Sequence, residues 1–332
     1  RIQCMSYYGK EAYGLYRKYS TKVVAHTIKT YSKYTTPYQY PVAISVEASS
    51  GMEYPMICFN YGRTDDDGTY SSRTKYGMIG VIIHEVGHNF FPMIINSDER
   101  NWSWMDEGLN TFVQFLTEQE FDNNYPSQRG PAHKIVDYMK MPKEQLEPIM
   151  TNSENIINFG PNAYAKPATG LNILRETIMG RELFDYAFKE YCNRWAYKHP
   201  APADFFRTME DASGVDLDWF WRAWFYELWK LDQSVKDVDY IEQDPTKGAL
   251  ITIENMEKMA MPAVVDVELV SGAKERFTFP VEIWQRGSSW TFRTSTNIPI
   301  KSVTIDPDHV FPDINSKNNV WRPTIFRAPR GN

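Results

Sequence analysis

The spacing of apolar residues changes near residue 231, and this change constrains the fold more than any other feature of the sequence. From Met78 to Leu228 apolar residues recur mainly at three- and four-residue steps, the period of an amphipathic helix. After Leu231 apolar and polar residues alternate, the period of a strand with one buried face. The chain has 332 residues, and a single core rarely grows past roughly 250 to 300. We therefore expect two domains, residues 1–235 and residues 236–332.

The N-terminal part of the first domain predicts one long helix and a small sheet. Residues 10–34 lack proline and carry apolar residues at helical steps, whereas Val42, Ile44 and Val46 alternate with their neighbours as a strand does, and residues 56–59 could form another strand. Strands first and helices afterwards favour an α+β domain over an alternating α/β one. Further helices are predicted at residues 81–91, 106–121, 132–139, 163–179, 181–198, 203–212 and 217–228.

The second domain is predicted to be a β-sandwich. Short alternating runs are separated by turn-like sequences, Ser271-Gly272 and Gly287-Ser288-Ser289. Regular turns between short strands are typical of an all-β sandwich. The alternating runs lie at residues 265–269, 277–283, 290–292 and 303–305.

Composition excludes several classes of function. The net charge is -6 and the basic residues are scattered among acidic ones, so we expect no nucleic-acid partner. Apolar stretches such as residues 78–83 are far shorter than the roughly 18 to 20 residues that cross a bilayer, so we expect no membrane span. The three cysteines, Cys4, Cys58 and Cys192, are widely spaced and are expected to be small buried hydrophobes. The sequence indicates neither an oligomeric state nor a compartment, and from its start at Arg1 we expect it to be a processed or trimmed piece.

His84-Glu85-Val86-Gly87-His88 matches the pattern HExxH, in a helix predicted to begin near Gly80. Residues four apart share a helix face, so both imidazoles can bind one zinc ion. Glu85 is offset around the helix and can reach a metal-bound water without binding the metal. Two ordinary helix histidines are the alternative explanation, but a chance match to the pattern has a probability of roughly one per cent or less.

A catalytic zinc ion needs a third protein ligand and one open position. Residues 89–106 separate His88 from Glu107, which opens a predicted helix with an apolar face. An acidic residue in a first helical turn is also what the helix dipole favours, so Glu107 alone would be unremarkable. Its distance from the HExxH pattern makes it the expected third ligand.

Taken together, these residues resemble the gluzincin aminopeptidases, the family of aminopeptidase N and leukotriene hydrolase. The resemblance rests on HExxH, the spacing to Glu107, and the Trp-x-x-Glu-Gly context of residues 104–108. Upstream, Gly51-Met52-Glu53-Tyr54 resembles the family's GxMEN exopeptidase motif. Downstream, Tyr164-Ala165-Lys166 resembles its catalytic tyrosine motif, YxKG. The order and spacing of the four elements match the family over about residues 40–174.

The resemblance implies a thermolysin-like, mainly helical catalytic domain with a small sheet, followed by an all-β sandwich domain, with the family's N-terminal domain missing. It implies a zinc aminopeptidase, holding one ion, that removes N-terminal residues from peptides through a metal-activated water. Glu85 would be the general base and a Tyr164 hydroxyl would stabilise the tetrahedral intermediate. Glu53 would pair with the free α-ammonium group of the peptide, and Gly51 and Met52 would line the peptide.

Three residues depart from the family's motifs. Ser50 stands where GxMEN has its first Gly and Tyr54 where it has Asn, so we expect the amine-binding end of the site to have its own shape. Pro167 replaces the Gly of YxKG, which a helix tolerates only in its first turn. We therefore expect side-chain selectivity to differ from that of better-known members.

Two other functions fit the same residues. One is a zinc hydrolase that acts on internal peptide bonds or on a non-peptide substrate, since leukotriene hydrolase shares this scaffold. The other is a catalytically silent binding module on the same fold. Such modules usually lack a ligand or the base, whereas all four of His84, Glu85, His88 and Glu107 are present here.

Overall fold

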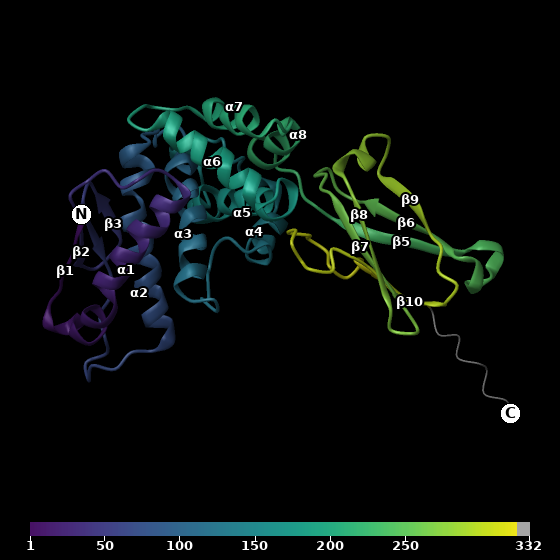
Figure 1. Ribbon diagram of the computed structural model, residues 1–332, viewed down its shortest axis with the longest axis horizontal. Coiled ribbons are helices and arrows are strands. Elements are labelled where there is room, and N and C mark those ends of the chain that lie inside the picture. The colour runs from purple at the N-terminus through teal and green to yellow at the C-terminus, as the bar shows by residue number, and fades with distance from the viewer. Residues whose placement is uncertain (324–332) are drawn as a thin grey trace. The chain divides into compact units, whose positions relative to one another are not determined.

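The computed structural model describes residues 1–323 and divides into two compact units (Figure 1). The first unit comprises residues 1–135 and 142–227. The second comprises residues 136–141 and the chain from Leu228 onward. Its first long strand, β5, spans Gln233–Tyr240, so the expected boundary between residues 235 and 236 falls within that strand.

A four-stranded sheet forms one layer of the first unit, in the order β1-β2-β4-β3. β1 (Gln3–Tyr7), β2 (Val42–Glu47) and β4 (Ile57–Asn60) run parallel, and β3 (Met52–Tyr54) pairs with β4 in the antiparallel direction at the sheet edge. Strands β2 and β4 were predicted, whereas β1 was missed because its five residues show no apolar alternation. The sheet edge therefore carries the segment that resembles GxMEN.

Two helices pack beside this sheet, α1 (Tyr13–Tyr34) and α2 (Ser72–Gly87), and a third, α3 (Leu109–Phe121), packs against both of them. Helix α2 begins earlier than the predicted start near Gly80, because the Ser71 side chain caps it by accepting a hydrogen bond from Thr74 N at 3.0 Å. The helix predicted over residues 81–91 also ends early. Phe91 has an extended backbone, with φ -129° and ψ 111°, and Pro92 follows it.

The later helices of the first unit surround an aromatic core. Trp104, Phe205 and Phe225 are fully buried there, and the Trp104 ring lies 4.7 Å from that of Phe225, centroid to centroid. Burial of such large rings dominates the energetics of a core. The helices of this part are α5 (Lys166–Ile173), α6 (Arg181–Trp195), α7 (Pro202–Ser213) and α8 (Asp218–Trp221), while α4 (Val136–Lys140) belongs to the second unit.

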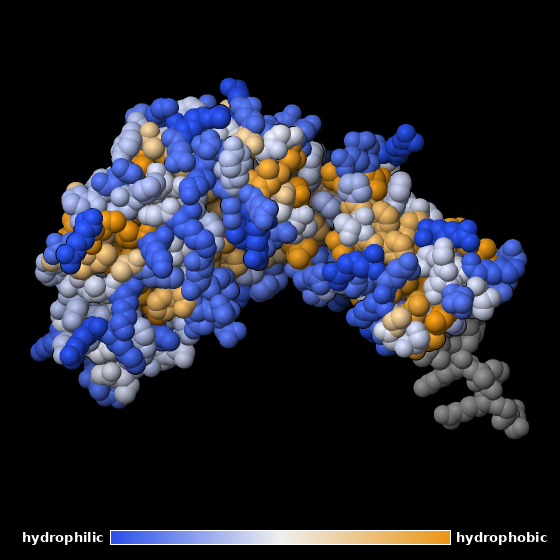
Figure 2. All heavy atoms as spheres, in the orientation of Figure 1, coloured by the Kyte–Doolittle hydropathy of each residue, from blue (hydrophilic) through white to orange (hydrophobic). Residues whose placement is uncertain are grey.

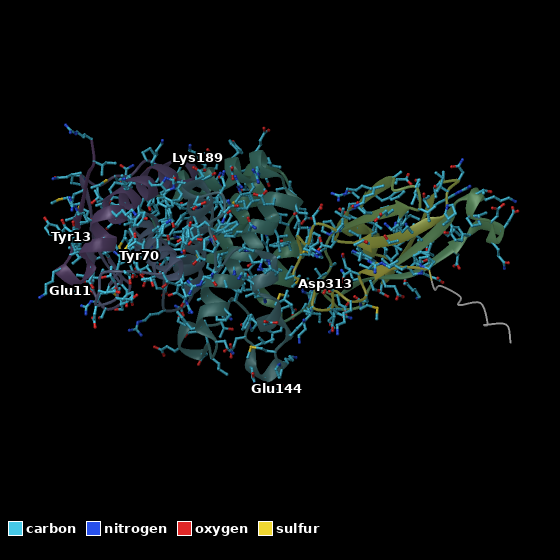
Figure 3. All side chains as sticks on the ribbon, turned by 90° about the horizontal axis from the view of Figure 1, so that it is seen from below. Glu11, Tyr13, Tyr70, Glu144, Lys189 and Asp313 are labelled. Atoms are coloured by element: carbon cyan, nitrogen blue, oxygen red, sulfur yellow. The ribbon has the colours of Figure 1, made fainter. Side chains whose placement is uncertain are left out.

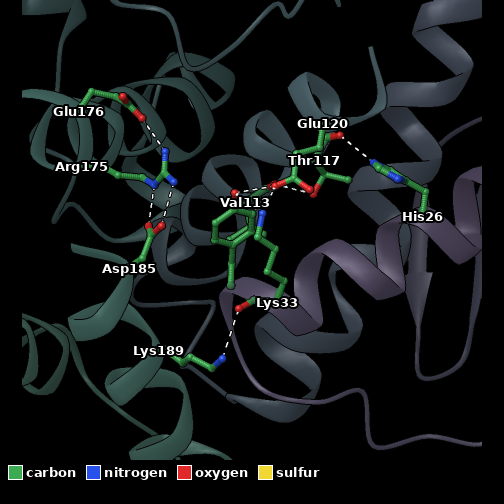
Figure 4. A network of polar contacts seen from close by, with 10 residues as sticks. His26, Lys33, Val113, Thr117, Glu120, Arg175, Glu176, Asp185 and Lys189 are labelled. Carbon is green, nitrogen blue, oxygen red and sulfur yellow. Dashed lines mark hydrogen bonds and ion pairs between the residues drawn. The ribbon is translucent and has the colours of Figure 1, made fainter. Parts of the chain in front are cut away.

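Polar contacts tie α1 to α3 and α6 at the surface (Figure 4). Lys33 Nζ lies 2.6 Å from Glu120 Oε1, and Lys189 Nζ donates to the Lys33 carbonyl at 3.4 Å. These exposed contacts stabilise the fold little. Arg175 forms the more buried contact, because its guanidinium donates to both carboxylate oxygens of Asp185 at 2.6 and 2.9 Å.

The second unit consists of two antiparallel sheets around one apolar core, which confirms the predicted sandwich. One sheet has the order β11-β10-β7-β8 and the other β5-β6-β9. The strand predicted over residues 277–283 begins earlier, at Lys274, and ends at Phe279, because Pro280 follows it and leads into a 3-10 turn. The strands are β5, β6 (Ala249–Asn255), β7 (Ala263–Leu269), β8 (Lys274–Phe279), β9 (Ser289–Thr294), β10 (Ile300–Ile305) and β11 (Val320–Trp321).

Hydrophilic residues cover much of the face of the first unit that Figure 2 shows, with small apolar areas between them. Among residues 1–323, no helix combines the length and the apolar character that a bilayer crossing requires.

Candidate active site

Helix α2 and the turn before α3 bring three metal-binding side chains together. His84 lies in the last turn of α2, His88 directly follows that helix, and Glu107 lies in the helical turn η3 (Trp104–Gly108). Glu107 Oε2 is 3.0 Å from His84 Nε2 and 3.4 Å from His88 Nε2. The candidate ligand atoms of the three residues all lie within 4.8 Å of one another. We call these residues the His-His-Glu cluster.

The other nitrogen of each imidazole is held by a polar partner. Gln114 Oε1 lies 2.8 Å from His84 Nδ1. The Phe91 carbonyl oxygen and Asp106 Oδ1 each lie 2.8 Å from His88 Nδ1. Histidines that bind metals usually make such a contact through the nitrogen that does not bind. Both Nε2 atoms are therefore oriented toward the centre of the cluster.

The residues present fit a divalent metal ion. Two imidazoles and one carboxylate form a ligand set of catalytic zinc sites, and they leave a position open for water or substrate. His84 is 7% exposed and His88 is 1% exposed, so the set is shielded from bulk water. The buried Glu85 Oε2 beside it has no hydrogen-bond partner among the described residues, which fits a site that receives a further polar group.

Burial and mutual contact shift the ionisation of the His-His-Glu cluster. Burial lowers the pKa of His84 below its ordinary value. Burial also acts to lower the pKa of His88, but contacts with Asp106 and Glu107 outweigh it and raise that pKa well above the ordinary value. Burial acts to raise the pKa of Glu107, and its contacts with both histidines reverse the effect, so that the pKa is lowered. Glu107 is thus held as a carboxylate, the form that binds metals.

Glu85 lies on α2, 8% exposed, with carboxylate atoms within 4.8 Å of Glu53 and His88. Burial raises its pKa to about 8, His88 acts to lower it, and Glu53 acts to raise it. A Cβ atom at Gly51 would overlap Glu85 Oε1. The position of Glu85 therefore requires the glycine at residue 51.

The segment resembling GxMEN forms the edge strand β3. Met52 is 41% exposed and Tyr54 is 50% exposed, whereas Glu53 between them is partly buried, as alternation along a strand requires. Glu53 is thereby placed beside Glu85, with Gly51 just before the strand. Tyr54, at the position of the motif's Asn, packs its ring 6.0 Å from that of Phe59.

Tyr164 also reaches the His-His-Glu cluster. It lies in the helical turn η7 (Gly160–Ala165), and its ring stacks on that of His84 with centroids 5.6 Å apart and planes inclined by 23°. Burial, together with the nearby carboxylate of Glu107, raises its pKa above the ordinary value. Its hydroxyl thus stays protonated and able to donate a hydrogen bond.

Pro167 lies in the first turn of α5, but α5 continues directly from the helical segment Gly160–Ala165, so the proline lies within continuous helical backbone and leaves one helix bond unmade there. A Cβ atom on Gly108 would lie 2.6 Å from Pro167 Cγ and 2.9 Å from the Ala163 carbonyl oxygen. Gly108 therefore allows the segment with Glu107 to pack closely against the segment with Tyr164.

Three residues at the site were missed by sequence reasoning: Gln114, Asp106 and Arg129. Gln114 is a hydrogen-bond partner of His84, Asp106 lies against His88, and the Arg129 guanidinium lies 4.2 Å from the centroid of the Tyr164 ring. Asp106 could have been proposed, because it directly precedes the expected ligand Glu107. Arg129 lies in a loop with no recognisable motif.

The sequence of the first unit matches one known protein family. Residues 19–224, more than half of the chain, match the peptidase family M1 domain. The chain belongs to this family, in agreement with the resemblance to the gluzincin aminopeptidases.

The relatives it matches are aminopeptidases. Glutamyl aminopeptidase of Bitis rhinoceros is 24% identical over 331 residues, which are 93% of this chain and 33% of that protein. Probable aminopeptidase 1 of Sulfurisphaera tokodaii is 24% identical over 231 residues, 65% of this chain and 28% of that protein. The crystal structure of Legionella pneumophila aminopeptidase A in complex with aspartic acid has a TM-score of 0.69 at 13% identity, covering 93% of this chain and 36% of that one. The chain thus spans about a third of these proteins, and the structural likeness confirms the fold.

Proposed function

We propose that this chain is the catalytic portion of a zinc-dependent aminopeptidase, which hydrolyses the N-terminal residue from peptides. Membership of peptidase family M1 and the aminopeptidase relatives support the reaction class. The observation that carries the proposal is the convergence of His84, His88 and Glu107 beside the paired carboxylates of Glu85 and Glu53. That arrangement combines a metal-binding set, a base and an acidic group for a substrate amine.

His84, His88 and Glu107 would hold one zinc ion through two Nε2 atoms and a carboxylate oxygen. When bound, the ion would act as a Lewis acid toward the scissile carbonyl and the attacking water. Asp106 and Gln114 fix the orientation of the imidazoles from behind.

Glu85 would act as the general base and acid. Its Oε2 atom has no hydrogen-bond partner among the described residues, so it is free to accept a proton from the attacking water. The same atom can return that proton to the nitrogen of the leaving amine, which balances the hydrolysis. The overlap that a side chain at residue 51 would create with Glu85 explains why this position carries glycine.

Tyr164 would donate a hydrogen bond from its hydroxyl to the carbonyl oxygen as negative charge develops there. Its ring is positioned for this by stacking on His84. Removal of one such donor typically lowers the rate about 10²- to 10³-fold.

Glu53 would select substrates with a free N-terminus. Its carboxylate lies beside Glu85 at the sheet edge and would pair with the α-ammonium group, while the backbone of Gly51 and Met52 lines the peptide. A blocked peptide would leave Glu53 desolvated without a cation, which is unfavourable.

Metal analysis joined to substrate assays tests this proposal on the full-length protein. We expect one zinc per chain, loss of activity on chelation, recovery with zinc, and cleavage of aminoacyl fluorogenic substrates. Matched N-acetylated substrates should be cleaved at least about 100-fold more slowly, as expected for loss of a charged pair. Equal rates on blocked and free substrates would instead indicate a hydrolase of internal or non-peptide bonds. Zinc binding without any hydrolysis would indicate a silent module.

A further inference from the structure

Arg129 lies beside the candidate site, in a turn that hydrogen bonds fix to the neighbouring helices. The loop after α3 is held by Tyr125, whose hydroxyl donates to the Tyr76 carbonyl, and by Ser127, whose hydroxyl donates to Glu118. Gly130 follows with a φ of +103°, a conformation that favours glycine. A Cβ there would lie 2.6 Å from the ring of Phe115, so the turn packs tightly against α3.

The turn places the guanidinium of Arg129 over the ring of Tyr164, 4.2 Å from its centroid. Stacking on the ring face leaves the N–H donors at the edge of the guanidinium available for other groups. Burial of the side chain lowers the pKa of Arg129, although the group stays charged.

No carboxylate of the described residues forms an ion pair or a side-chain hydrogen bond with Arg129. The two carboxylates that most affect its pKa are engaged elsewhere. Glu107 is in contact with both histidines, and Glu118 accepts hydrogen bonds from Ser127 and Gln114. A partly buried guanidinium is normally paired, so this one is a candidate to receive an acidic group from outside.

We propose that Arg129 binds a carboxylate of the substrate on the C-terminal side of the scissile bond. This inference rests on the proposed aminopeptidase function. The carboxylate of Glu53 lies within 4.8 Å of ligand atoms of His88 and Glu85. The guanidinium of Arg129 instead lies over the ring of Tyr164, which stacks on His84. We consider a peptide whose α-ammonium group pairs with Glu53 and whose scissile carbonyl accepts a hydrogen bond from Tyr164. The part of this peptide after the scissile bond would then lie near Arg129.

The carboxylate has two possible sources, the C-terminus of a dipeptide and an acidic side chain directly after the scissile bond. Arginine binds either through two parallel N–H bonds. A lysine at this position would supply the charge without the planar pair of donors. The two sources can be separated with substrates that differ by a single carboxylate.

The test measures kcat/KM of the full-length protein on two matched pairs of substrates. Ala-Ala against Ala-Ala amide examines the C-terminal carboxylate, and Ala-Asp amide against Ala-Asn amide examines the side chain. We expect the wild type to prefer the acidic member of one pair. Arg129→Met should lower kcat/KM for that substrate about 10- to 100-fold and change the neutral member less than about two-fold. Arg129→Lys should recover part of the loss.

Activity on the neutral substrates also shows that the Arg129→Met variant is folded. Arg17→Met is the matched control, since Arg17 lies 5.1 Å from the ring centroid of the exposed Tyr13, which is labelled in Figure 3. It should leave all four substrates unchanged. An equal loss on acidic and neutral substrates would assign Arg129 to holding Tyr164 and overturn the inference. A wild type that shows no preference in either pair would also overturn the inference, but it would not contradict the aminopeptidase function. A wild type that cleaves none of the four would refute the proposed function, and the inference with it.

Discussion

Asp106 Oδ1 lies 2.8 Å from Nδ1 of His88, on the side of the imidazole that faces away from Glu107. Asp106 is 4% exposed, and burial raises its pKa to about 7. The Phe91 carbonyl oxygen is the hydrogen-bond partner of the same Nδ1 atom, and the Asp106 carboxylate lies beside it as a charged neighbour of the ring that contributes Nε2 to the His-His-Glu cluster. This placement makes Asp106 a positioning residue for the proposed metal site.

Asp106→Ala should weaken zinc binding about 10- to 100-fold, because the His88 ring loses one of its two outer partners. Asp106→Asn, which can still accept a hydrogen bond, should recover much of that affinity. Competition with a chromophoric chelator measures the effect. Asp98→Asn, at an exposed position, is the control and should bind zinc as the wild type does. Unchanged affinity in Asp106→Ala would contradict the role assigned to this residue.

Glu85→Gln should retain zinc and lower kcat about 10²- to 10⁴-fold, because an amide of the same shape cannot accept the proton of the attacking water. Zinc content and steady-state kinetics on one aminoacyl substrate measure both properties. Glu154→Gln serves as control, since the Glu154 side chain is 73% exposed. Turnover near the wild-type rate in the Glu85→Gln variant would remove Glu85 from the mechanism.

Gly51→Ala should lower kcat about 10-fold or more, because the new methyl group overlaps Glu85 Oε1 and displaces the base. The matched control is Gly77→Ala on α2, where an added Cβ meets no atom within 4 Å. That change should preserve activity and stabilise the helix by about 0.5 to 1 kcal/mol. Kinetics and thermal unfolding of both variants measure the effects. Equal activities of the two variants would show that the Glu85 side chain can move away from the added methyl group without loss of catalysis.

The three residues of the His-His-Glu cluster could be predicted from the sequence, whereas most of the residues that contact them could not. HExxH and the spacing to Glu107 are local patterns, so they identified three side chains that the structure brings together. Gln114 and Arg129 were not predicted, because only tertiary packing brings Gln114 into contact with His84 and Arg129 into contact with Tyr164. The helix start at Ser72 was also missed, since polar residues form its first turn and the cap at Ser71 is a weaker pattern than apolar spacing.

Lys166 gives a prediction about stability and pH. It is 3% exposed, and burial lowers its pKa from 10.5 to about 8. Between these two values the unfolded chain holds a proton that the folded chain has released, so this residue makes stability rise as pH increases from about 8 to 10.5.

Below pH 8 Lys166 is charged in the folded protein, and burial of this charge lowers the free energy of unfolding by an amount on the order of 3 kcal/mol. The advantage of Lys166→Met over the wild type should therefore shrink across this interval, as measured by urea unfolding at several pH values. Lys189→Met, at the exposed position labelled in Figure 3, should show no such trend. A constant difference between wild type and Lys166→Met would mean that Lys166 is hydrated in the folded state.

The close packing of Gly108 on Pro167 has a consequence for motion. The segment bearing Glu107 and the segment bearing Tyr164 touch through backbone and ring atoms, without long flexible side chains between them. Because closely packed groups transmit displacements to one another, we expect a shift of one segment to be accompanied by a shift of the other. We therefore expect the separation between the Glu107 carboxylate and the Tyr164 phenol to vary little.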